Sequence, residues 1–275
     1  MRKILAIFDE AHFTESTVQF AARLNKHEPV LLVGIFLPPV DYLDTMVYYF
    51  GWMFGPLNFP GLDLREKEEN IKRFEACCKE NNIECKVHDF EGHIVEHLKI
   101  ESRFADLMIT SNDLFYKDLD YQNDYISEAV HKAECPILIV SEQDHFPENI
   151  IVAYDGTASS VFALKQLNYL FPEFAEMSIL IVYATEKGND FPNMSYIEEL
   201  CARHFKHYNF YKLDADPKKY FNTWLAEKGN TLLVSGSGGR SDTAELLKKS
   251  FVREVIKLPG FVSEYGHASF FGKSS

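Results

Sequence analysis

The chain has 275 residues, of which 46% are hydrophobic and 25% are charged, and its formal net charge is −13 at pH 7. This composition is typical of a globular protein and supplies apolar side chains for two cores of ordinary size. The negative charge argues against nucleic acid and anionic membranes as partners.

Five scattered cysteines form no CxxC pair, which indicates reduced thiols and no metal site. The N-terminal apolar run is too short for a signal peptide, and no apolar run reaches the ~20 residues of a membrane span. We therefore expect a cytoplasmic protein.

The first part of the chain alternates apolar runs with amphipathic segments. Such alternation is typical of an α/β fold with a parallel sheet. Strands are expected at 3–8, 29–36, 84–90, 106–110 and 136–140, and helices at 14–25, 63–81, within 92–104 and at 124–133.

Residues 40–63 interrupt this pattern with aromatic side chains separated by glycines and prolines. The favoured interpretation is an inserted loop whose aromatic residues pack onto the core, because large apolar side chains are usually buried. The alternative is a self-association surface or a lid, which would require these side chains to be exposed.

The pattern begins again near Asn149, where the run Ile150–Asp155 parallels Ile4–Asp9. The repeat predicts two similar domains, residues 1–145 and 146–275, joined near 142–148. In the second domain we expect strands at 150–154, 177–183, 209–213 and 231–235, a last strand near 258–263, and helices at 159–170, 194–207, 216–227 and 242–257.

A glycine cluster follows the expected strand that ends at Ser235. Gly236, Gly238 and Gly239 precede a helix expected to begin near Asp242. Glycines let backbone N–H groups approach an anion closely, and a helix N-terminus favours negative charge. The order of strand, glycine turn and helix therefore predicts a phosphate-binding site. The spacing fits neither a P-loop nor a dinucleotide fingerprint.

These features together resemble the universal stress protein family in its tandem form. Gly236 and Gly239 are similar to the first glycine pair of the family's nucleotide-binding motif, residues 240–248 supply its nine-residue spacer, and Lys249-Ser250 stands where Gly-Ser is expected. Asp155-Gly156-Thr157 resembles the family's Asp-Gly-Ser, and Cys135–Val140 resembles its last strand.

The resemblance implies two domains of the adenine nucleotide alpha hydrolase-like fold, each an open five-stranded parallel sheet flanked by helices. It implies that ATP or AMP, with Mg²⁺, binds at the carboxyl ends of the second domain's strands. Asp155 would contact the adenosine and Tyr183 the base. The phosphates would meet Gly236, Gly239 and Ser250, with Ser235 and Phe251 beside them. Lys249 would either obstruct a phosphate, neutralise it or face water.

The first domain keeps Asp9 but has no glycine between Gly92 and Gly156. We therefore expect it to bind no nucleotide and to support the second domain. The resemblance implies a stress-related regulatory protein, and no residue is placed as a nucleophile or general base for an enzyme. The alternative is a nucleotide-free structural or interaction module. We expect the two domains to pair within one chain, and a homodimer remains open.

Overall fold

The structure is a computed structural model of the 275-residue chain. It describes residues 1–10, 12–37, 64–89, 94–112, 114, 132–141, 146–184, 190–213, 230–236 and 268–272. The aromatic segment 40–63 lies outside these residues. So do the helices expected at 216–227 and 242–257, and nearly all of the one expected at 124–133.

Strands and helices alternate in the first part of the chain as expected from its apolar pattern. The described elements are β1 (Arg2–Asp9), α1 (Glu15–Asn25), β2 (Val30–Leu37), α3 (Leu64–Glu80), β3 (Glu84–His88), α4 (Ile94–Arg103), β4 (Leu107–Ser111) and β5 (Ile137–Val140). The strands β1, β2, β4 and β5 consist mainly of buried aliphatic residues, as is usual for parallel strands covered on both faces.

The second part repeats this alternation, with one short 3₁₀ helix that the apolar pattern did not predict. Its described elements are β6 (Asn149–Ala153), α7 (Ala158–Leu170), η1 (Pro172–Glu176), β7 (Ser178–Ala184), α8 (Met194–His204), β8 (His207–Leu213), β9 (Thr231–Gly236) and β10 (Ala268–Gly272).

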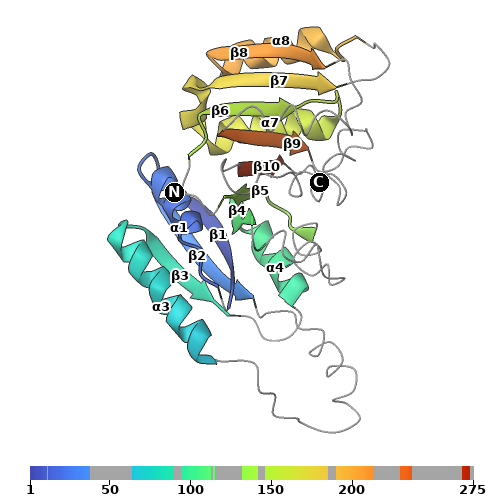
Figure 1. The fold of residues 1–275 in the computed structure, drawn as a ribbon. Helices are drawn as coiled ribbons and strands as arrows, with labels where there is room; N and C mark the ends of the chain where they lie inside the picture. Colours follow the sequence, from blue (N-terminus) through green and yellow to red (C-terminus); the bar gives the residue numbers. More distant parts are fainter. Residues whose placement is uncertain are drawn as a thin grey trace, which may run out of the picture.

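All ten described strands belong to one sheet, in the order β3-β2-β1-β4-β5-β10-β9-β6-β7-β8. The five strands on each side of the middle follow the same order and are parallel to one another. The fold is therefore α/β, with two similar five-stranded parallel units flanked by helices. Figure 1 shows the units above and below β5 and β10, which lie side by side between them.

The two units meet through an antiparallel pair of strands. Ile139 pairs with Ser269, Leu138 with Phe270 and Ile137 with Phe271, so the pairing is symmetric about Leu138 and Phe270. The expected packing of the two halves within one chain is therefore present in this strand pair.

The prediction for the last strand was wrong. We expected it near 258–263, whereas the strand that pairs with β9 and β5 is β10, Ala268–Gly272. Residues 258–263 lie outside the described part. The error arose because a five-residue strand near a chain end has too short an apolar run to stand out from its surroundings.

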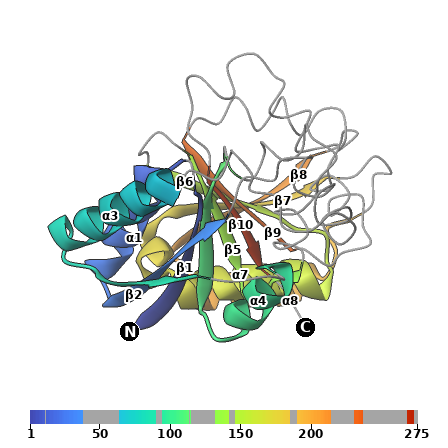
Figure 2. The same ribbon diagram turned by 90° about the horizontal axis from the view of Figure 1, so that it is seen from below.

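One hydrophobic cluster runs through both units on one face of the sheet. It contains buried residues of α1 and α3 together with those of α7 and α8, and inward-facing residues of β1, β2, β4, β6, β7 and β9. A second cluster covers the opposite face of the first unit, where α4 contributes Leu98. Figure 2 shows the helices disposed around the twisted sheet as seen from below.

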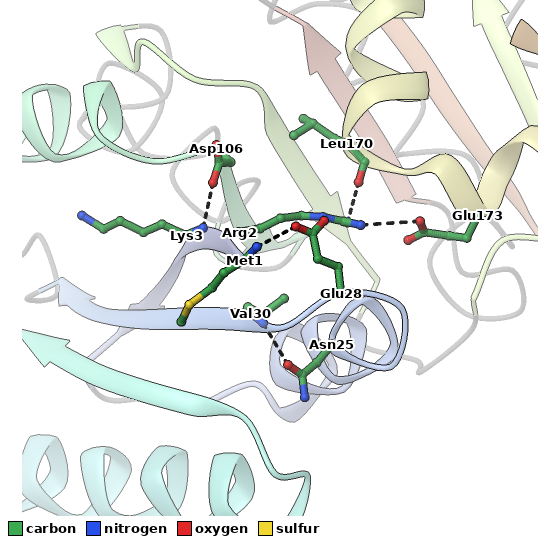
Figure 3. Close-up of polar contacts among 9 residues, drawn as sticks. All are labelled: Met1, Arg2, Lys3, Asn25, Glu28, Val30, Asp106, Leu170 and Glu173. Carbon is green, nitrogen blue, oxygen red and sulfur yellow. Dashed lines mark hydrogen bonds and ion pairs between the residues drawn. The ribbon is translucent and has the colours of Figure 1, made fainter.

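Polar groups near the N-terminus also join the units. The Arg2 guanidinium is almost fully buried and donates through NH1 to the carbonyl oxygen of Leu170, at 2.5 Å, where α7 ends. Its Nε donates to Glu28 at 2.7 Å, and its NH2 lies 3.8 Å from a carboxylate oxygen of Glu173 in η1. Figure 3 shows Arg2 reaching from β1 toward both groups of the second unit.

Phe146 adds an apolar contact at the same junction. Its ring stacks on Phe20 of α1, with the ring centroids 5.1 Å apart, and meets Phe174 of η1 edge-on at 5.3 Å. The guanidinium of Arg23 lies 5.2 Å from the centre of the same ring. The segment that links the units is therefore packed between a helix of one and a 3₁₀ helix of the other.

Candidate functional site

Four of the predicted site residues lie at the carboxyl edge of the second unit. Asp155 follows β6, Tyr183 is near the end of β7, and Ser235 and Gly236 end β9. The sheet places β6 between β7 and β9, so these residues share one edge. This is where ligands bind in open α/β sheets. Gly239, Lys249, Ser250 and Phe251 lie outside the described residues, and their predicted roles stay predictions.

Asp155 shapes the turn between β6 and α7. Its Oδ1 accepts hydrogen bonds from the backbone N–H of Thr157 at 2.9 Å and from the Thr157 hydroxyl at 2.6 Å. Thr157 is the N-cap of α7, and its Oγ1 accepts from the N–H of Ser160 at 3.4 Å. The Ser159 hydroxyl lies 3.0 Å from the Thr157 hydroxyl. Asp155 therefore organises a helix N-terminus that carries a row of short hydroxyl side chains.

The backbone conformation of the Asp155-Gly156-Thr157 turn requires a glycine at its centre. Gly156 has φ of +78°, and a Cβ at this position would lie 2.8 Å from Cβ of Pro192. A side chain here would be strained and would collide with the segment that precedes α8. The sequence could have shown this role, because a glycine directly after a strand-ending aspartate is typical of a left-handed turn.

Gly236 lies against the backbone of α7. A Cβ on Gly236 would lie 2.4 Å from the carbonyl carbon of Ser159 and 2.6 Å from the backbone nitrogen of Ser160. Any other residue would push β9 and the first turn of α7 apart. The glycine that we predicted to approach a phosphate is therefore required by the packing of the protein itself.

The Tyr183 ring, predicted to lie beside the base, contacts the protein's own aromatic side chains. Its centroid is 5.5 Å from that of Phe191, which stacks on Tyr154 at 5.4 Å with an interplanar angle of 13°. Phe191 also meets Phe210 of β8 edge-on at 5.4 Å. The apolar pattern gave no indication of Phe191, because it lies in the loop before α8 and reaches Tyr183 only in the folded chain.

Tyr154 is the most buried member of this aromatic group. It is 1% exposed, and its hydroxyl donates to the carbonyl oxygen of Pro192 at 3.0 Å. Burial raises the pKa of Tyr154, and a hydrogen bond with Asn193 opposes the rise. Tyr154 therefore ties the end of β6 to the loop before α8.

Ser235 has a buried hydroxyl without a hydrogen-bond partner in the described structure. Its backbone pairs with Ala153 of β6. In the first unit Thr110 has the corresponding register, opposite Ile7 of β1, and its buried hydroxyl also lacks a partner. The orphaned hydroxyl is therefore common to both units and does not by itself mark the second one as a binding site.

The corresponding edge of the first unit is filled by phenylalanines. Phe8 of β1 lies 5.2 Å from Phe36 and from Phe13, and 5.6 Å from Phe74 of α3, measured between ring centroids. Phe74 also covers Gly34, whose absent Cβ would lie 2.9 Å from the Phe74 ring.

Lys67 forms two ion pairs at the same edge of the first unit. Lys67 Nζ lies 2.7 Å from Glu10 and 2.8 Å from Asp89. Burial opposes the charge on Lys67, but hydrogen bonds to Asp89 and Glu10 outweigh it and raise its pKa. Two carboxylates face one ammonium group, so an anion would meet unfavourable charge here.

The described part of the second unit fits one portion of a nucleotide better than another. The hydroxyl-rich first turn of α7, beside Asp155 and Gly236, suits an anionic or ribose group that accepts and donates hydrogen bonds. The Tyr183 ring suits a base less well, because Phe191 already packs against it. Within the described residues, no cluster of histidines, cysteines or carboxylates has a metal-binding arrangement.

No described helix is both long and apolar enough to cross a membrane. No family model matches the chain, and a search of curated proteins gives no match.

Solved structures show the same fold. A universal stress protein from Archaeoglobus fulgidus DSM 4304 is similar with a TM-score of 0.68 and 15% identity, over 100% of this chain and 97% of that one. The cytoplasmic domain of a prokaryotic cation chloride cotransporter has a TM-score of 0.54 and 11% identity, over 98% and 94%. A functionally unknown protein from Pseudomonas aeruginosa PAO1 has a TM-score of 0.51 and 10% identity, over 99% and 93%.

Proposed function

We propose that this chain is a tandem member of the universal stress protein family. In this proposal it is a cytoplasmic, stress-related regulatory protein that binds ATP or AMP in its second domain, residues 146–275, and carries out no turnover. The shared fold and the motif Gly236, Gly239 and Ser250 support the family assignment. The equal strand order of the two units, joined by β5 and β10, supports the tandem arrangement.

The observation that carries the nucleotide site is the difference between the two carboxyl edges. The first unit fills its edge with Phe8, Phe36 and Phe74 and places two carboxylates near it. The second unit has a turn of small and hydroxyl residues around Asp155 and the first turn of α7. Hydrogen-bonding groups at a helix N-terminus are the usual environment of a bound phosphate or ribose.

Mass spectrometry of the ligand released from the purified, denatured protein tests the proposal directly. Calorimetric titration with ATP and with AMP, each with Mg²⁺, complements it. We expect one adenine nucleotide for each chain. Asp155→Asn should weaken binding while keeping an oxygen that accepts from Thr157, so the turn itself is preserved.

Lys249→Gly examines the departure from the family motif, and Lys248→Gly is its matched control. A lysine that obstructs a phosphate predicts tighter binding of Lys249→Gly, and a lysine that neutralises it predicts weaker binding. Gly236→Val is unsuitable for this purpose, because a side chain there disturbs α7 whether or not a ligand binds. If neither the wild type nor Lys249→Gly releases or binds a nucleotide, the nucleotide site is refuted.

The second candidate function is a nucleotide-free interaction module. It is favoured by Phe191, which covers the Tyr183 ring, and by the packing role of Gly236, which explains that glycine without a ligand. In this case Phe191→Ala would leave nucleotide titrations without heat, as in the wild type. Self-association through 40–63 remains a prediction, which the molar mass in solution with and without that segment would test.

A further inference from the structure

Three of the five cysteines lie at the junction of α3 and β3. Cys77 and Cys78 are in the last turns of α3, and Cys85 is in β3. Cys78 is fully buried in the hydrophobic cluster, and Cys85 is partly buried against the same cluster. The Cys78 side chain interacts with that of Cys85, with the Cys78 thiol as the hydrogen-bond donor.

The chain reversal between the helix and the strand produces this contact. The N–H of Ile83 donates to the carbonyl oxygen of Cys78 at 2.9 Å, and Asn82 has the left-handed φ of +54° that turns the chain back. β3 then runs alongside α3 at the outer edge of the sheet. This position leaves Cys85 partly accessible from outside while Cys78 lies behind it in the core.

Cys77 is directed elsewhere, although it is adjacent to Cys78 in sequence. Its sulfur accepts from the side-chain nitrogen of Asn81 at 3.8 Å and from that of Gln19 at 4.0 Å. The two neighbouring cysteines therefore have different hydrogen-bond partners, and Cys85 is a partner of Cys78.

The second unit provides an internal comparison. Cys85 pairs with Leu32 of β2, and Tyr208 pairs with Ile179 of β7 in the corresponding register. Cys201 of α8 precedes Tyr208 by the same number of residues as Cys78 precedes Cys85, and it is equally buried. The second unit thus keeps the helix cysteine but has a tyrosine in place of its partner.

We propose that Cys78 and Cys85 are an oxidisable dithiol that forms an intramolecular disulfide when the protein reacts with a peroxide. In the first step the Cys85 thiolate attacks one peroxide oxygen. The O–O bond breaks, Cys85 becomes a sulfenic acid and hydroxide leaves, taking up a proton to form water. Cys78 then attacks the Cys85 sulfur, the S–O bond breaks and a second water leaves. Two thiols and one hydrogen peroxide thus give one disulfide and two waters.

The surroundings of the two thiols indicate which one attacks the peroxide and how fast the reaction is. Burial raises the pKa of Cys85, and the hydrogen bond from Cys78 partly offsets that rise. Burial raises the pKa of Cys78 more strongly, and the contact with Cys85 adds to the rise. Cys85 is therefore the attacking thiol and Cys78 the resolving one. Because both thiols are mainly protonated at pH 7, the reaction is slow compared with that of an activated cysteine.

The test uses the full chain, reduced, desalted and treated with hydrogen peroxide or, in a second arm, with diamide. Remaining thiols are alkylated and the protein is digested with trypsin without reduction. Cleavage after Lys79 separates the two cysteines, so the disulfide joins peptide 74–79 to peptide 80–86. We expect this linked pair, and a fall of two in the number of alkylated thiols, both reversed by dithiothreitol.

Two variants distinguish the partners within peptide 74–79. Cys77→Ser should keep the linked pair, whereas Cys78→Ser and Cys85→Ser should abolish it and leave the other thiol free or oxidised singly. Cys201→Ser should have no effect on the linkage. A linked pair that survives Cys78→Ser would overturn the proposal, as would oxidation of Cys85 to sulfinic acid with no linked peptide in either arm.

Discussion

The two units of the sheet share a strand order but differ in the side chains packed at the carboxyl end of their first strand. We call this place the corner of each unit. Phe8 lies near the end of β1 beside Phe36 in the first unit, and the corresponding places in the second hold Tyr154 and Tyr183. In the first unit Phe74 of α3 completes the packing, and in the second it is Phe191 of a loop. The contrast shows that the α/β topology depends on the apolar strands and tolerates different side chains at the turns.

The turns themselves differ in charge and in size. Glu10, after β1, carries a carboxylate that pairs with Lys67, whereas Gly156, after β6, carries no side chain. The first unit therefore stabilises this turn by its own ion pairs, and the second has a glycine at the same place.

A large expected effect comes from Gly236→Val, which would break the close approach of β9 to α7. The added side chain meets the backbone of Ser159, which cannot move away cheaply. We expect the free energy of unfolding to fall by roughly 3 kcal/mol, at the upper end of overpacking effects. Urea denaturation followed by circular dichroism measures this change.

The matched control is Ser111→Val, at the corresponding end of β4. Ser111 already has a Cβ, and valine there removes the hydrogen bond that the hydroxyl accepts from the N–H of Leu114, at 3.3 Å, and adds one methyl group. A loss of about 1 kcal/mol is expected there. Equal losses for the two variants would contradict the packing role assigned to Gly236.

A loss of similar size is expected from Arg2→Met, which removes the cation that the first unit extends to the second. Glu173 would then be a carboxylate with both oxygens buried and without its ion-pair partner among the described residues. The Leu170 carbonyl would lose a donor as well. We expect a loss of roughly 2–4 kcal/mol in the free energy of unfolding, measured by urea denaturation.

The double variant with Arg2→Met and Glu173→Met should recover most of that loss, because an apolar pair can replace a buried ion pair. Lys3→Met is the control within one unit, since Lys3 pairs with Glu101 of the same unit and is partly exposed. Its expected loss is below about 1 kcal/mol. A double variant as unstable as Arg2→Met alone would show that the ion pair is not the source of the effect.

The regular elements could be predicted from the sequence because each is a local pattern. Strands β1 and β6 lie in short apolar runs that are followed by Asp9 and Asp155 in the sequence, and the similarity of these runs predicted the repeated order. The last strand could not be predicted, because β10 is specified by its neighbours β5 and β9 more than by its own five residues.

The candidate site could be located but not built from sequence alone. A position after a strand predicts the edge on which Asp155 lies, and the structure confirms that placement. The contacts of Gly236 with α7 and of Tyr183 with Phe191 join residues that are distant in sequence. Periodicity contains no information about such contacts, so a packing glycine and a ligand-binding glycine give the same pattern.

The smallest expected effect comes from Tyr154→Phe, which makes the second corner resemble the first, where Phe8 has no hydroxyl. The variant loses the hydrogen bond to the Pro192 carbonyl, and we expect a loss of about 1 kcal/mol at pH 7. The difference should depend on pH. Because the folded pKa of Tyr154 is raised, its stabilising contribution is complete below the unfolded value of about 10 and is lost as pH rises beyond it.

Denaturation of the wild type and the variant between pH 7 and 11 measures this dependence. The difference in unfolding free energy should narrow above about pH 10, because only the wild type must keep a buried tyrosine protonated. Tyr169→Phe is the control, since Tyr169 is 60% exposed and should show no such change. A constant difference across this range would mean that the Tyr154 hydroxyl ionises as readily in the folded chain as in the unfolded one, and that the corner beside Phe191 admits water.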